Sequence, residues 1–171
     1  MKITFIGAGS VQFTTAVVHD ITTYSALDAA EICLMDIDAY RLKKITECVE
    51  RIKKEMNSNI RIIATTDREA ALTGADAVIC TVFNGDVDIW QHEILIPKKY
   101  GVDINVGDTR SVSGIFRALR NIPLLIDICR DILQDLGLLG IGLGQGLDTL
   151  DGVQDGGMVT AVELLADVLQ G

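Results

Sequence analysis

The chain has 171 residues, 49% of them hydrophobic, and a formal net charge of -9. This composition favours one folded domain, too short to include a full second domain, and argues against nucleic acid and anionic membrane surfaces as partners, so we expect a small-molecule partner. The N-terminus lacks a secretory pattern, no run approaches the ~20 apolar residues of a membrane span, and the four cysteines form no Cys-x-x-Cys pair, so we expect a cytoplasmic protein with reduced thiols.

The first predicted element is a buried strand that ends in a Gly-x-Gly turn and opens a helix. Lys2–Ile6 form the strand and Val11–Thr22 the helix, whose unpaired N–H groups would cradle a diphosphate. Gly7 would allow the tight bend, and Gly9 would let a pyrophosphate approach closely. Gln12 stands where the third glycine of the fingerprint belongs, so a glycine turn that binds no nucleotide is the alternative. The candidate cofactor-binding residues are Gly7, Gly9, Ser10 and Val11.

A carboxylate follows the second predicted strand, Glu31–Asp36. Asp36 at its tip would accept from the ribose hydroxyls of NAD and repel the 2′-phosphate of NADP. The alternative is that Asp36 or Asp38 only caps the helix that begins near Ala39, a role that suits Asp38. The turn and the carboxylate together favour NAD.

The next elements continue the alternation of strands and helices. We expect a helix over 39–56, a strand over 61–64, a short helix over 67–72 and a strand over 75–82. Such an order requires parallel crossovers and predicts an α/β, Rossmann-like, doubly wound parallel sheet with helices on both faces. The residues beyond the fourth strand would contact the nicotinamide half of the coenzyme, although an ordinary polar loop is the alternative; these are Thr81, Asn84 and Gly85.

Two further helices are predicted, over 88–100 and 111–136. Trp90, Ile94 and Leu95 would form the packing face of the first, and His92 would be exposed or at the edge of the core rather than a metal ligand. The second helix carries apolar residues at helical spacing, with a kink expected at Pro123. Arginines near its start would meet an anionic substrate or cofactor group, or would simply be solvated; they are Arg110, Arg117 and Arg120.

Five segments form a longer pattern: Gly7–Val11, Leu34–Asp38, Ile96–Gly101, Gly107–Thr109 and Gly114–Pro123. In this order they resemble glycoside hydrolase family 4, with its α-galactosidase and α-galacturonidase branches the most similar. The resemblance extends over about residues 1–133 and is more specific than any glycine motif alone.

The resemblance implies hydrolysis of α-galactosides or α-hexuronides with NAD as a catalytic participant and a divalent metal, usually manganese. Hydride is removed from C3 of the sugar, a proton from C2, the aglycone is eliminated, water adds, and the hydride returns. This route needs no pair of catalytic carboxylates. We name Asp108 and Arg117 as candidate substrate-binding residues.

The sequence departs from the family after about residue 133. The family's Asn-Pro motif, its Cys-His segment with metal ligands and its catalytic tyrosine are absent, the two histidines lie upstream at His19 and His92, and no cysteine follows Cys129. We therefore assign no metal ligand and no catalytic residue, and manganese is expected only from the family.

We expect residues 1–136 to form the NAD-binding domain and 137–171 a divergent glycine-rich segment with a helix over Met158–Leu169. In one interpretation Leu138–Leu143 adds a fifth strand and completes the same domain, although its glycine density makes a poor strand. In the other, the tail results from truncation, a frameshift or a junction with unrelated sequence. Both interpretations stay open.

Three functions compete. The first is the NAD-binding portion of a family 4 glycosidase, inactive alone. The second is an active NAD-dependent glycosidase or dehydrogenase with an atypical site, in which Asn84, Asp108 and Arg117 carry the chemistry. The third is a non-enzymatic scaffold of the same fold, in which exposed apolar surface drives self-association into a homodimer.

Overall fold

The computed structural model describes residues 1–104 and 111–135. The chain divides into two compact units, the first containing Met1–Thr81 and the second beginning at Val82. Asp108, Arg110 and the whole predicted tail, 137–171, lie outside the described residues. The expected boundary of the NAD-binding domain at residue 136 therefore stays a prediction.

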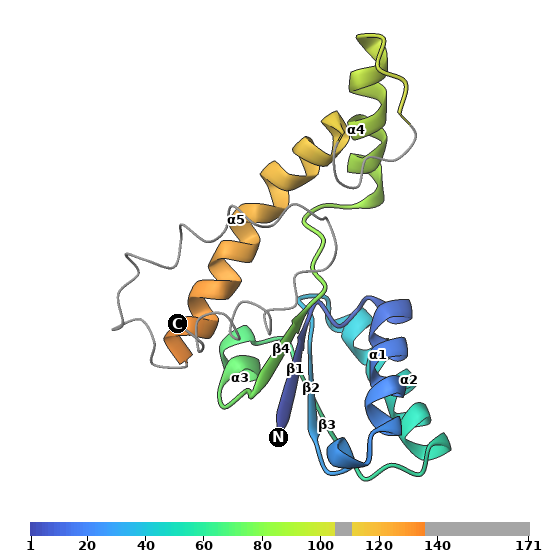
Figure 1. The fold of residues 1–171 in the computed structure, drawn as a ribbon, viewed down its shortest axis with the longest axis vertical. Helices are drawn as coiled ribbons and strands as arrows, with labels where there is room; N and C mark the ends of the chain where they lie inside the picture. Colours follow the sequence, from blue (N-terminus) through green and yellow to red (C-terminus); the bar gives the residue numbers. More distant parts are fainter. Residues whose placement is uncertain (105–110, 136–171) are drawn as a thin grey trace. The chain divides into compact units, whose positions relative to one another are not determined.

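A four-stranded parallel sheet forms the centre of the first unit, in the order β3-β2-β1-β4 (Figure 1). The register places Phe5 of β1 between Leu34 of β2 and Ile79 of β4. Each strand returns to the sheet through a crossover connection, as parallel strands require. The predicted parallel α/β sheet is confirmed, with the strands β1 (Lys2–Ile6), β2 (Glu31–Met35), β3 (Arg61–Thr65) and β4 (Ala77–Cys80).

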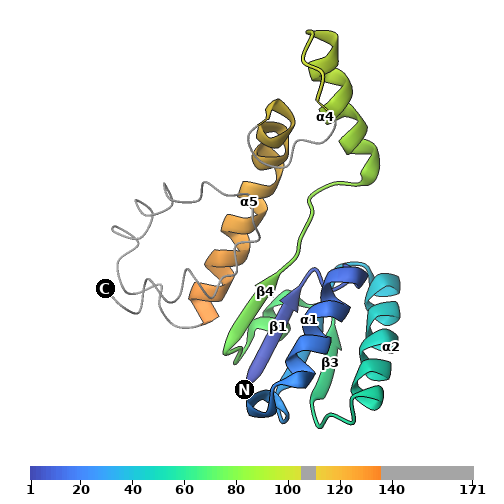
Figure 2. The same cartoon turned by 45° about the vertical axis from the view of Figure 1, so that its right-hand side comes forward.

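Helices cover both faces of this sheet, as predicted. α1 (Val11–Thr23) and α2 (Ala39–Glu55) lie side by side on one face (Figure 2). α3 (Arg68–Leu72) lies on the other face, where the Thr4 hydroxyl donates to the Ala71 carbonyl at 2.9 Å. A short 3₁₀ helix, Ser25–Leu27, follows α1.

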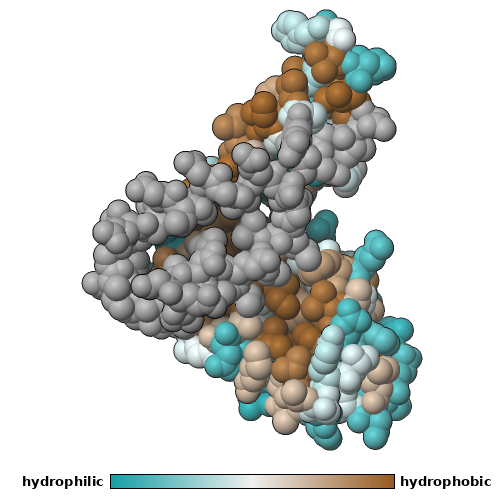
Figure 3. Space-filling model, viewed as in Figure 1, coloured by the Kyte–Doolittle hydropathy of each residue, from teal (hydrophilic) through white to brown (hydrophobic). Residues whose placement is uncertain are grey.

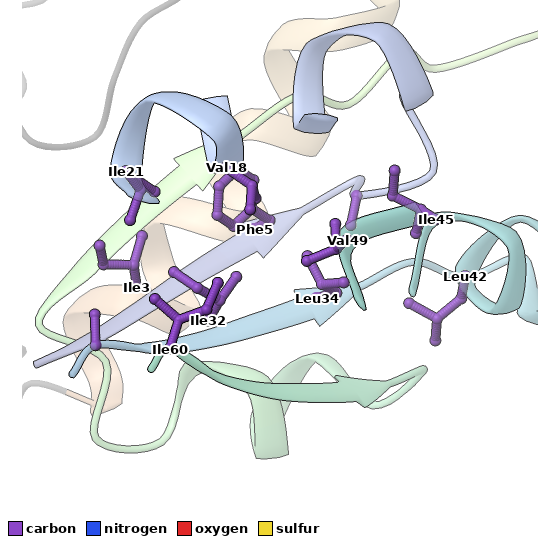
Figure 4. Close-up of a cluster of buried hydrophobic side chains, with 12 residues drawn as sticks. Ile3, Phe5, Val18, Ile21, Ile32, Leu34, Leu42, Ile45, Val49 and Ile60 are labelled. Carbon is purple, nitrogen blue, oxygen red and sulfur yellow. The ribbon is translucent and has the colours of Figure 1, made fainter. Parts of the chain in front are cut away.

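The hydrophobic core of the first unit lies between the sheet and the pair α1 and α2 (Figure 4). Phe5, Ile32 and Leu34 point from the strands toward these helices, because side chains at alternate strand positions share one face. Each is fully buried, which contributes about 1.5–3 kcal/mol per large apolar side chain. The helices contribute Val18, Ile21, Leu42, Ile45 and Val49.

All four cysteines are free thiols in the described residues. Cys33 on β2 is buried, and the others are half-buried. Burial raises the pKa of the Cys33 thiol, while the charge of Lys2 acts weakly in the opposite direction. The absence of a pair among these described cysteines agrees with the expectation of reduced thiols.

The second unit contains α4 (Val87–Lys99) and α5 (Val112–Asp135), which pack against each other. Each helix contains one proline, Pro97 in α4 and Pro123 in α5. The predicted packing face of α4 is wrong in part: Ile94 is half-buried, but Trp90 and Leu95 are 38% and 51% exposed, whereas Glu93 is 3% exposed. Glu93 faces α5, where it pairs with Arg117 and Arg120.

Large apolar side chains gather on the surface of the second unit, over α4 and α5 (Figure 3). On α5 the most exposed are Ile115, Leu119 and Ile122, at 59%, 67% and 50%. His92 is exposed, as expected. Across residues 1–104 and 111–135, no helix combines the length and apolar character needed to cross a bilayer.

Candidate nucleotide-binding site

The Gly7–Ser10 turn joins β1 to α1 and is anchored on the end of β2. The main-chain N–H groups of Gly7 and Ala8 both donate to the Met35 carbonyl at 2.9 Å. Gly7 has φ +85°, in the left-handed region that favours glycine. The tight bend predicted at Gly7 is therefore present.

Gly9 lies against Asp36. Its N–H donates to Asp36 Oδ2 at 2.7 Å, and a Cβ built on Gly9 would lie 2.6 Å from that oxygen and 2.9 Å from Arg41 Cβ. Real Cβ atoms do not approach other atoms so closely, so only glycine fits here. Sequence reasoning assigned Gly9 to phosphate approach alone and missed this second requirement.

Asp36 and Asp38 have separate roles. Asp38 is the N-cap of α2, and its Oδ1 accepts from the N–H groups of Tyr40 and Arg41 at 2.9 and 3.1 Å. Asp36 is not that cap: it is 9% exposed, and its Oδ1 accepts from the Asp38 N–H at 2.9 Å while Oδ2 accepts from Gly9. Each oxygen has two lone pairs, so each can accept one more hydrogen bond.

The start of α1 differs from the starts of α2, α3 and α4. Those three helices have aspartate N-caps, whose carboxylates accept from first-turn N–H groups. α1 has Ser10, which makes no side-chain cap hydrogen bond, and no acidic residue in its first turn. The first N–H groups of α1 therefore remain available as hydrogen-bond donors. Together with the positive end of the helix dipole, they favour an anion at this position.

Thr81 belongs to the same site. Its hydroxyl donates to the Gly7 carbonyl at 2.8 Å, and its N–H donates to the Ile6 carbonyl at 2.8 Å. The first unit thus brings together the predicted residues at the carboxyl edge of the sheet: Gly7, Gly9, Ser10, Val11, Asp36 and Thr81.

The remaining candidate residues that the structure describes lie in the second unit: Asn84, Gly85, Arg117 and Arg120. The Asn84 N–H donates to Asn121 Oδ1 at 2.8 Å, and its Nδ2 donates to the Arg120 carbonyl at 2.8 Å. Asn84 is therefore held by α5, and its expected contact to the nicotinamide half stays a prediction.

Arg117 and Arg120 contact aromatic rings and a buried carboxylate. The Arg117 guanidinium carbon lies 5.0 Å from the Trp90 ring centroid and 5.7 Å from that of Phe83. Its Nε lies 4.0 Å from Glu93 Oε2, and Arg120 is bound to Glu93 Oε1. With side chains 18% and 23% exposed, the two arginines are not the solvated residues of the alternative interpretation.

Glu93 is the residue of this cluster that sequence reasoning missed. The available signal was a glutamate between the apolar pairs Ile89–Trp90 and Ile94–Leu95, one helix before a pair of arginines three residues apart. In residues 1–104 and 111–135, no group of three or more histidine, cysteine, aspartate or glutamate side chains could hold a metal ion.

Comparison with known proteins gives a consistent set of relatives. The family described as family 4 glycosyl hydrolase matches residues 2–136. An α-galactosidase of Rhizobium meliloti is 41% identical over 133 residues, which cover 78% of this chain and 27% of the relative. An α-galacturonidase of Thermoanaerobacter italicus is 33% identical over 132 residues, which cover 77% of this chain and 28% of the relative.

Among solved structures, the 6-phospho-β-glucosidase of Thermotoga maritima with manganese, NAD⁺ and glucose-6-phosphate matches with a TM-score of 0.69 and 27% identity. That match covers 78% of this chain and 32% of the other. The chain therefore spans less than a third of the length of each of these three relatives.

Proposed function

The chain belongs to the family 4 glycosyl hydrolases, and from this membership we propose that its first unit is the NAD-binding portion of a glycosidase. The observation that carries the proposal is the pairing of a glycine turn, Gly7–Ser10, with Asp36 beside an α1 start that no aspartate caps. A solved family member with 27% identity contains NAD⁺, which supports the same assignment.

The donors and acceptors of this site suit NAD. The first N–H groups of α1 would bind the pyrophosphate, and the remaining lone pairs of Asp36 would accept from the adenosine ribose hydroxyls. The Asp36 charge would disfavour the 2′-phosphate of NADP. Gly9 keeps Asp36 close to the turn, so that one ligand can contact both.

For the complete glycosidase we propose hydrolysis of an α-galactoside or α-hexuronide, because relatives named for both activities match this chain. In that reaction bound NAD supplies the acceptor for hydride from C3 of the sugar. The protein would hold the sugar and move the C2 proton. We propose that Asp108 and Arg117 contact the sugar.

We derive no step through manganese from this chain. Solved relatives contain it, but residues 1–104 and 111–135 provide no cluster of ligands for it. We therefore propose that the 171-residue chain binds NAD without catalysing hydrolysis. Its partners in this proposal are the coenzyme, a sugar and a second copy of the chain, which the exposed apolar residues of α5 would favour.

Two assays on the whole chain test these statements. Calorimetric titration should show one NAD site and binding of NADP at least about tenfold weaker, and absence of heat at millimolar NAD would contradict the binding proposal. An aryl α-galactoside and an aryl α-galacturonide should not be cleaved with NAD and manganese present. Manganese-dependent turnover would instead support the active enzyme with an atypical site. Absence of both NAD binding and turnover would support the scaffold.

A further inference from the structure

A buried carboxylate of the second unit has no part in the function proposed above. Glu93 on α4 is 3% exposed, and its main-chain carbonyl accepts from the Ser113 hydroxyl of α5 at 2.5 Å. Burial of an ionised carboxylate is costly unless it is paired and hydrogen-bonded. Its partners therefore show which groups the carboxylate keeps in place.

Arg120 on α5 connects Glu93 to the loop that follows β4. One guanidinium nitrogen, Nη2, donates to Glu93 Oε1, and the other, Nη1, donates to the main-chain carbonyl of Asn84. The planar guanidinium fixes the direction of both donors at once, which a lysine ammonium cannot do. The Arg120 guanidinium therefore reaches the Asn84 carbonyl in the same orientation in which it pairs with Glu93.

The loop is fastened to α5 at Asn84 by three polar groups. Besides its carbonyl, the Asn84 N–H binds Asn121 Oδ1 and its Nδ2 binds the Arg120 carbonyl, both at 2.8 Å. The next residue, Gly85, has φ +128°, and a Cβ there would lie 2.7 Å from Arg120 Nη1. A side chain at Gly85 would thus displace the guanidinium from the Asn84 carbonyl.

We propose that Glu93 is a positioning residue that, by orienting Arg120, fixes the main chain of Asn84 and with it the loop of residues 82–86. The proposal rests on the proposed function, because this loop follows the fourth strand of the coenzyme-binding sheet, where the nicotinamide contacts are expected. Glu93 itself contacts neither coenzyme nor sugar in this account and acts through Arg120.

The test compares Glu93→Gln with a matched control, Asp127→Asn, in the full chain. Asp127 also pairs with an arginine of α5, Arg130, at 3.3 Å, but both side chains are at least 60% exposed. Amide hydrogen exchange should rise at least tenfold at Asn84 and its loop neighbours in Glu93→Gln, with exchange along α4 and α5 unchanged. NAD affinity should fall several-fold, and Asp127→Asn should change neither quantity.

Arg120→Lys is the second variant and decides the question if Glu93→Gln does not fold. Lysine keeps the positive charge but lacks the two fixed donors of the guanidinium, so the same local rise in amide exchange is expected. Wild-type exchange in the loop of either folded variant would overturn the proposal. An equal rise in amide exchange along α4 and α5 would also overturn the proposal, because it would show that the Glu93–Arg120 pair only stabilises the packing of the two helices.

The coenzyme measurement is separate from the exchange measurement. If the wild-type chain binds no NAD, the proposed function fails, while loop exchange still decides the role of Glu93. If the loop loosens and NAD affinity stays unchanged, the link between the loop and the coenzyme is overturned.

Discussion

The main-chain N–H of Gly9 donates to Asp36 Oδ2 at 2.7 Å, a hydrogen bond between two residues 27 positions apart. It ties the glycine turn after β1 to the carboxylate after β2. A ligand that binds the first N–H groups of α1 therefore meets the Asp36 charge as well. This juxtaposition is what the proposed NAD site requires.

Asp36→Asn should reduce the preference for NAD over NADP. The amide keeps an acceptor for Gly9 but loses the charge that disfavours the 2′-phosphate, so we expect the affinity ratio to fall at least about tenfold. Calorimetric titrations with both coenzymes measure it. Asp38→Asn, which changes the α2 cap instead, is the matched control and should keep the ratio.

Gly9→Ala should abolish measurable NAD binding, because the added Cβ would lie 2.6 Å from Asp36 Oδ2 and force the turn and carboxylate apart. Gly74→Ala is the control. Its φ of +68° makes alanine strained, but a Cβ there meets nothing within 4 Å. We expect it to cost about 1 kcal/mol of stability and to leave the coenzyme titration intact. Equal NAD affinity in Gly9→Ala and the wild type would refute this account of the turn.

Ser10→Asp should change stability and binding in opposite directions. A carboxylate at the N-cap of α1 would interact with the helix dipole and stabilise the fold by about 0.3–1 kcal/mol. It would also repel the coenzyme phosphates and weaken NAD by roughly tenfold or more. Urea unfolding and NAD titration measure the two effects, and Ser10→Asn provides a neutral cap as control. Unchanged NAD affinity in Ser10→Asp would argue against phosphate binding at this helix.

Asp28 should contribute stability that disappears in acid. Hydrogen bonds from the side chain and then the N–H of Asn59 hold the pKa of the Asp28 carboxyl below its ordinary value of 3.8. Because the folded-state pKa is the lower one, the stabilisation is complete above 3.8 and is lost as the pH falls through the folded-state pKa. The difference in urea midpoint between wild type and Asp28→Asn should therefore narrow in acid. A constant difference would contradict the assignment.

The alternation of strands and helices was predictable because each strand is a short apolar run bounded by turn residues. The fourth strand was predicted over 75–82 and is observed as Ala77–Cys80, the residues that pair with β1. The position of Asp36 beside the glycine turn was also predictable, since the carboxyl ends of adjacent parallel strands meet at one edge.

The burial of Glu93 was not predictable from α4 alone. Helical periodicity assigns Trp90 and Leu95 to the buried face, because a glutamate is rarely buried without a partner. The partner, Arg120, is 27 positions away on α5, and its contact with Asn84 depends on Gly85. Contacts between separate elements decided this face, and local sequence does not encode them.

The turn before α1 and the carboxylate after β2 together form the proposed NAD site. The most direct measurement is the ¹⁵N–¹H spectrum of the whole chain during titration with NAD. The amide signals of Gly9, Ser10 and Val11 should shift in proportion to occupancy, together with those flanking Asp36, while signals at the carboxyl end of α2 stay in place. Unchanged turn signals at millimolar NAD would contradict the claim.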